Sequence, residues 1–240
     1  MKSITNLLFL LISVAVITGC GDDDNMANPN PPNSPTEAFT YLALGDSYTI
    51  GTSVEEDQRW PRQLLDALLA DRVVAGDPAP QLTYIATNGW RTDQLQAGIR
   101  NTDLAETYDL VSLLIGVNNQ FQSRPLNVYQ EEFTDLLNTA ISKAGGDLDR
   151  VFVVSIPDYA FTPFGNGRDN ISRGVDVFNA AAREITEAAG VPFYNITPIS
   201  REGLRDPGLV ASDDLHPSGQ QYARWVTEVL LQPVAARINN

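Results

Sequence analysis

The chain has 240 residues, with 16 lysines and arginines against 30 aspartates and glutamates, so its formal net charge is −14. This excess of negative charge argues against nucleic acid or an anionic membrane face as a binding partner. Cys20 is the single cysteine, which excludes an intrachain disulfide. We expect residues 39–240 to form one domain with a substantial core.

The first residues predict an export signal. Lys2 precedes a largely apolar stretch, residues 7–17, that is too short to span a membrane as a helix. Ile17-Thr18-Gly19-Cys20 resembles the bacterial lipobox, in which the cysteine is lipidated and becomes the mature N-terminus. The resemblance implies a signal peptide over residues 1–19 and a lipid anchor at Cys20 that holds the protein on a membrane without spanning it. The alternative is a soluble export signal with an incidental cysteine.

Residues 20–38 are rich in proline, asparagine and aspartate, and they contain nothing that could form a core. We expect a disordered tether between the lipid anchor and the domain. Its Asp22-Asp23-Asp24 run is either plain solvated charge or similar to the acidic export signal of surface lipoproteins. We therefore expect the protein in the bacterial cell envelope, at the outer membrane or the cell surface.

Short β-prone segments alternate with helical patterns along the rest of the chain. The β-prone segments are mostly apolar and lack strict alternation, which is typical of parallel strands buried on both faces. This order predicts an α/β fold with a five-stranded parallel sheet and helices on both sides. The expected strands are 39–44, 82–87, 110–115, 151–156 and 192–196; the expected helices are 61–70, 128–144, 175–189 and one from Ser218, which with Gln221 forms a capping box.

A serine, a histidine and an aspartate point to nucleophilic catalysis. His216 is the only histidine, so it is the only imidazole that could take a proton from a serine such as Ser47. Asp213 lies three residues before it, where its carboxylate can orient the ring, whereas Asp214 is assigned to solvent. A reaction of this kind also needs donors for the negative oxygen that develops on the substrate. The candidates are the backbone N–H groups of Ser47 and Gly89 and the side-chain amide of Asn118.

Four segments together carry a family resemblance. Residues 45–47, Gly89, residues 116–119 and residues 213–217 resemble the sequence blocks of SGNH (GDSL-type) hydrolases, in order and at similar spacing. The resemblance implies a flavodoxin-like three-layer α/β/α sandwich. It also implies hydrolysis of ester or thioester bonds without a metal or cofactor, with Ser47, Asp213 and His216 as catalytic residues. Asn119 stands where the family usually has aspartate, so we expect altered local hydrogen bonding with the chemistry retained.

Aromatic residues follow these blocks and could contact substrate or simply pack in the core. The candidates are Tyr48, Trp90, Phe121 and, in the long loop 157–167, Tyr159. The sequence favours a serine esterase with an acyl-enzyme on Ser47 and a small-molecule, glycan or lipid ester as substrate. A carbohydrate O-deacetylase of the same fold and a non-catalytic surface protein that binds glycan or lipid remain as alternatives.

Overall fold

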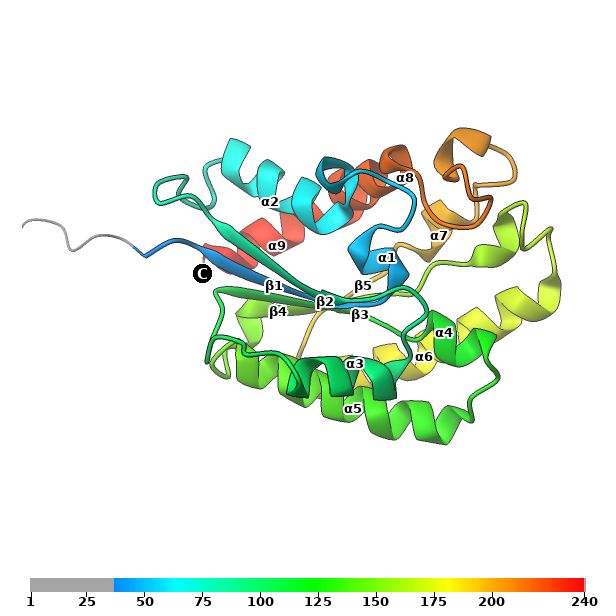
Figure 1. Ribbon diagram of the computed structural model, residues 1–240, viewed down its shortest axis with the longest axis horizontal. Coiled ribbons are helices and arrows are strands. Elements are labelled where there is room, and N and C mark those ends of the chain that lie inside the picture. The colour runs from blue at the N-terminus through cyan, green and yellow to red at the C-terminus, as the bar shows by residue number, and fades with distance from the viewer. Residues whose placement is uncertain (1–36, 240) are drawn as a thin grey trace, which may run out of the picture. The chain divides into compact units, whose positions relative to one another are not determined.

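The computed structural model describes residues 37–239, and the predicted signal peptide with nearly all of the tether lies outside them. Its centre is a five-stranded parallel sheet of order β2-β1-β3-β4-β5 (Figure 1). The strands are β1 (Thr40–Gly45), β2 (Gln81–Ala86), β3 (Leu110–Leu114), β4 (Val151–Val154) and β5 (Phe193–Tyr194). The predicted α/β fold with a five-stranded parallel sheet is confirmed.

Helices cover both faces of the sheet (Figure 1). One layer contains α2 (Trp60–Ala70), α8 (Gly219–Arg224) and α9 (Leu231–Ile238); the other contains α3 (Thr92–Arg100), α5 (Leu126–Lys143) and α6 (Asp169–Ala188). Residues 37–239 also contain the short helices α1 (Ser47–Ile50), α4 (Val117–Phe121) and α7 (Thr197–Ser200). 3₁₀ turns span Glu56–Gln58, Leu148–Arg150, Tyr159–Phe161 and Pro207–Leu209. Because β1 lies between two strands and two helical layers, its residues Tyr41–Leu44 are fully buried.

Helix α3 is absent from the sequence-based prediction. Its apolar periodicity is sparse, because only Leu95 is a fully buried large apolar residue and most of the helix is polar. Helix α6 also begins at Asp169, six residues before the predicted start at Val175. Its first turns carry charged and polar residues that hide the amphipathic pattern.

The C-terminal helical segment starts at its predicted signal, but the capping box is only half formed. Ser218 Oγ accepts from the backbone N–H of Gln221 at 3.2 Å. The side chain of Gln221 instead donates to the carbonyl of Leu209 at 2.8 Å, because that buried carbonyl lies within its reach. A wider π-helical turn, Trp225–Leu230, precedes α9, where Pro233 has no N–H to give to the helix.

The parallel register brings the ends of three strands to one edge of the sheet. Gly45 pairs with Ala86 of β2 and with Leu114 of β3. The segments that follow these strands therefore begin side by side, and α1 and α4 lie at this edge (Figure 1). Beyond the carboxyl ends of parallel strands is where open α/β sheets place their ligands.

Candidate active site

Ser47 lies at the first turn of α1, directly after β1. Asp46 caps this helix by accepting from the backbone N–H of Tyr48 at 3.0 Å. The turn requires glycine at position 45, since a Cβ there would lie 2.1 Å from Thr49 Oγ1. Ser47 is 3% exposed and lines a cavity of about 200 Å³ that His216 also lines. The fold thus brings together two residues that are 169 positions apart.

Asp213 and His216 form a tight pair on the loop that leads into α8. His216 Nδ1 lies 2.6 Å from Asp213 Oδ2, and Asp213 Oδ1 accepts from the backbone N–H groups of His216 and Leu215 at 2.9 and 3.0 Å. With Nδ1 engaged, Nε2 is the ring nitrogen left to exchange a proton. Within residues 37–239 no hydrogen bond directly joins Ser47 to His216, and catalytic contacts of this kind often tighten only when substrate binds.

Ser53 is a part of this arrangement that the sequence reasoning missed. Its hydroxyl donates to Asp213 Oδ2 at 2.7 Å, the same oxygen that faces His216. Partial burial alone would raise the pKa of Asp213, but the hydrogen bonds from Ser53, His216 and Leu215 outweigh it and hold that pKa well below its usual range. The only local signal is the closeness of Ser53 to Ser47, because the contact with Asp213 joins residues 160 positions apart.

The carboxylate of Asp46 lies beneath the site and is fully buried. Oδ1 caps α1, and Oδ2 accepts from Asn118 Nδ2 at 3.4 Å. Burial raises the pKa of Asp46 to about 7, partly opposed by the hydrogen bonds from Tyr48 and Asn118. Asp46 therefore supports its neighbours Tyr48 and Asn118 through hydrogen bonds, and its charge changes close to neutral pH.

The candidate oxyanion donors come from the ends of β1, β2 and β3. Asn118 follows Gly116 at the start of α4, and its Nδ2 donates to the carbonyl of Trp90 at 3.0 Å. That contact orients the amide. The second hydrogen of the amide makes only the long contact to Asp46 Oδ2. Gly89 has φ of 81° and open space where a side chain would be, although Asn88 rather than Gly89 lines the cavity. A substrate carbonyl could approach this backbone closely.

Asn119, the departure from the family pattern, is buried and bonded on both sides to Thr92. Its Oδ1 accepts from the backbone N–H of Thr92 at 3.1 Å, and its Nδ2 donates to Thr92 Oγ1 at 2.6 Å. The Thr92 hydroxyl is then free to donate to Glu132. An aspartate could not donate to Thr92, so asparagine here sets the direction of the whole chain of hydrogen bonds.

The four aromatic candidates lie in different surroundings. The ring of Tyr48 lies 5.1 Å from that of His216, and Tyr48, Phe121 and Tyr159 all line the cavity. Trp90 is not among its lining residues; its ring packs against Gly98 of α3, where any side chain would collide with it. Phe164 also lines the cavity, and sequence reasoning did not single it out beyond placing it in a long loop.

The described residues contain no cluster of three or more metal-ligating side chains. Within the same range, no helix is long and apolar enough to cross a membrane. Of the cavity residues, only His216 carries a titratable nitrogen, and its Nδ1 already faces a carboxylate. The arrangement is suited to proton transfer and nucleophilic attack.

The model of the GDSL-like lipase/acylhydrolase family matches residues 43–224, which include Ser47, Asn118 and His216. The chain belongs to this family. A search of curated proteins found no match.

Solved structures of family-like proteins share the fold at low sequence identity. An acetylxylan esterase from Geobacillus stearothermophilus is 18% identical, with a TM-score of 0.62 over 86% of this chain and 96% of its own. A lipolytic G-D-S-L family protein from Veillonella parvula is 15% identical, with a TM-score of 0.59 over 83% and 96%. A psychrotrophic esterase from Pseudoalteromonas is 18% identical, with a TM-score of 0.57 over 84% and 99%.

Proposed function

We propose that the protein is a metal-independent serine esterase that hydrolyses carboxylic esters or thioesters through an acyl-enzyme on Ser47. The observation that carries the proposal is that Ser47, Asn118 and His216 line one cavity. In that cavity the Nδ1 atom of His216 is held by Asp213. Family membership supports an ester substrate, and the geometry supports the roles of the residues.

The reaction proceeds in two balanced steps. Ser47 Oγ attacks the ester carbonyl while its proton passes to His216 Nε2, and Asn118 with the backbone N–H of Ser47 and Gly89 stabilises the negative oxygen. Collapse of this intermediate breaks the bond to the alcohol, which takes the proton from His216. Water then repeats the sequence on the acyl-enzyme and releases the acid.

The test is replacement of Ser47 by alanine. We expect Ser47→Ala to lower kcat for p-nitrophenyl esters at least ~10³-fold, because residual rates come only from binding and the oxyanion donors. A fluorophosphonate probe should label the wild-type protein and not the variant. Circular dichroism checks that the fold is unchanged, and Ser212→Ala, an exposed serine on the loop before Asp213, serves as the control. An active Ser47→Ala protein would reject the assignment.

We further propose that the protein is anchored to a bacterial envelope membrane through lipid on Cys20. The lipobox-like sequence supports this, and Cys20 has no other cysteine to pair with. Cys20→Ser should abolish incorporation of labelled palmitate and move the protein from the membrane fraction to the soluble fraction. Membrane retention of the variant after a carbonate wash would contradict the proposal.

A further inference from the structure

Three aromatic side chains form one continuous surface along the cavity. Phe121 comes from α4, whereas Tyr159 and Phe164 come from the loop after β4. Their ring centroids lie 6.1 Å apart for Phe121–Tyr159, 6.2 Å for Phe121–Phe164 and 6.4 Å for Tyr159–Phe164, within the range of interacting aromatic pairs. We call these three residues the aromatic wall.

Two members of the aromatic wall are exposed, whereas Tyr159 is buried. Phe121 is 55% exposed and Phe164 45%, and they are two of the four large apolar side chains that are exposed in residues 37–239. Both line the cavity that contains Ser47 and His216. Exposed apolar rings beside a reactive serine lose contact with water when substrate binds, so they favour an apolar occupant.

The rest of the cavity also suits an acyl chain better than a sugar ring. Apart from His216, no charged or titratable side chain other than tyrosine lines it, and Val117 and Leu215 extend the apolar surface. Tyr159 donates its hydroxyl to Gln120 Oε1 at 2.7 Å, so that hydroxyl is already engaged. Helix α4 carries both Asn118 and Phe121, so the aromatic wall lies in the same cavity as the candidate oxyanion donor and close to it along the chain.

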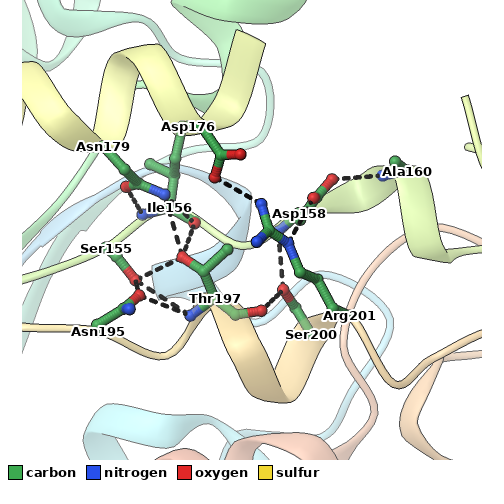
Figure 2. A network of polar contacts seen from close by, with 10 residues as sticks. All are labelled: Ser155, Ile156, Asp158, Ala160, Asp176, Asn179, Asn195, Thr197, Ser200 and Arg201. Carbon is green, nitrogen blue, oxygen red and sulfur yellow. Dashed lines mark hydrogen bonds and ion pairs between the residues drawn. The ribbon is translucent and has the colours of Figure 1, made fainter. Parts of the chain in front are cut away.

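A polar network centred on a buried aspartate holds the base of the loop that carries Tyr159 and Phe164 (Figure 2). Asp158 is fully buried; its Oδ1 accepts from Ala160 N at 3.0 Å, and its own N–H donates to Ser200 Oγ at 2.8 Å. Arg201 Nε donates to Asp158 Oδ2 at 2.9 Å, and Arg201 Nη2 donates to Asp176 Oδ1 at 2.5 Å. Arg201, directly after α7, thus ties the loop to α6.

The tip of the same loop is tied to the catalytic turn. The backbone N–H of Phe164 donates to the carbonyl of Asp214, between Asp213 and His216, at 3.0 Å. Gly165 allows the chain to close on itself, because a Cβ there would lie 1.8 Å from the carbonyl of Tyr159. Because Asp158 begins the loop that carries both rings, we expect a shift at Asp158 to move the rings.

We propose, building on the esterase function above, that the aromatic wall binds the acyl group of the ester and that Arg201, acting through Asp158, is its positioning residue. The cavity of about 200 Å³ takes an acyl group of butyryl to octanoyl size, with the alcohol part outside. Arg201 touches neither substrate nor the reacting atoms. Its effect is therefore on selectivity between acyl groups.

The first test compares p-nitrophenyl octanoate with p-nitrophenyl acetate. Each methylene group that loses its apolar contact lowers binding about fourfold. Phe164→Ala and Phe121→Ala should each lower the octanoate-to-acetate ratio of kcat/KM roughly tenfold, mainly through KM for octanoate. Val177→Ala, which removes an apolar side chain of similar exposure from α6, is the control and should leave the ratio unchanged.

The second test addresses Arg201. Arg201→Met should lower the same ratio about fivefold or more, and Arg201→Lys should restore part of it by keeping a positive charge beside Asp158. The matched control is Arg205→Met, which removes an arginine that is 79% exposed and paired with Glu202.

A double variant tests whether Arg201 acts through the aromatic wall. In the Phe164→Ala background, Arg201→Met should have little further effect on the ratio, because both changes act on the aromatic wall. Asp176→Asn, at an exposed position, should shift the ratio in the same direction about twofold and covers the case in which Arg201→Met does not fold.

The outcomes separate this inference from the esterase proposal. If the wild-type protein hydrolyses neither ester and takes no fluorophosphonate label, the esterase function itself fails. If it hydrolyses both but wall variants change the two rates alike, the acyl-binding role is overturned. The acyl-binding role would also be overturned if kcat/KM depended on the alkyl length of the alcohol and not on that of the acyl group. Additive effects of Arg201→Met and Phe164→Ala on the ratio would overturn the positioning role.

Discussion

At the residue scale, the Asp213 carboxylate is the centre of the proposed acid–base arrangement. It accepts from two backbone N–H groups, from Ser53 and from His216. Four contacts leave it little freedom to rotate, so His216 keeps one tautomer and one orientation. Ser53 contributes to this from the segment that follows α1. Its hydrogen bond therefore joins the chain that carries the proposed nucleophile, Ser47, to the partner of the proposed base, His216.

Replacement of Ser53 should weaken catalysis without removing it. A hydrogen bond to a charged group contributes about 1.5–3 kcal/mol, so Ser53→Ala should lower kcat/KM roughly tenfold or more. Ser53 has φ of 68°, a conformation that glycine adopts freely. Ser53→Gly is therefore the matched variant: it should lose as much activity as Ser53→Ala but keep more stability. Full activity of Ser53→Gly would mean that the hydroxyl has no role.

At the element scale, the link between α3 and α4 positions the proposed oxyanion donors Gly89 and Asn118. Asn119 of α4 makes two hydrogen bonds to Thr92 at the start of α3, and the Thr92 hydroxyl donates to Glu132 of α5. Asn118, the residue before Asn119, donates to the carbonyl of Trp90 just before α3. Two adjacent asparagines thus tie the segment after β2 to the segment after β3, which holds Gly89 and Asn118 near each other.

Asn119→Asp should therefore lower stability while activity persists. An aspartate would compete with Glu132 for the single hydroxyl hydrogen of Thr92, leaving one buried acceptor without a donor. We expect a loss of about 1–3 kcal/mol in the free energy of unfolding, measured by urea titration, with kcat changed only a few fold. Glu132→Gln in the same protein should recover part of the loss by supplying a donor. Stability equal to that of the wild type would show that the direction of these hydrogen bonds has no importance.

At the scale of the whole molecule, burial of Asp46 makes stability depend on pH. The pKa of Asp46 is about 7 in the folded protein, above the ordinary aspartate value of 3.8, so the folded state holds its proton more tightly than the unfolded state. This contribution is fully present below about pH 4 and is lost as pH rises to about 7. The opposite applies to Asp213, whose lowered pKa contributes stability that is lost as pH falls in the acid range.

Asp46→Asn should flatten this dependence. The wild-type free energy of unfolding should fall by up to about 4 kcal/mol more than that of the variant between pH 4 and pH 7, since each pKa unit corresponds to about 1.36 kcal/mol. Urea unfolding at a series of pH values gives both curves. Asp109→Asn is the control, as its carboxylate bonds to Thr40 at an exposed position. Parallel curves for Asp46→Asn and wild type would contradict the raised pKa.

Local pattern was enough to predict the α/β class, the five parallel strands and the residues that could do chemistry. Apolar runs identify buried strands without reference to partners, and the single histidine left only one candidate base. Helix α3 was not predicted because most of its residues are polar.

Only the tertiary structure decided which side chains surround the residues of the candidate site. Ser53 meets Asp213, Asn119 meets Thr92 and Arg201 meets Asp158 across 27 to 160 positions, and Trp90 turns toward Gly98. Such contacts depend on how strands align and how loops close. The local periodicity of the sequence contains no information about either.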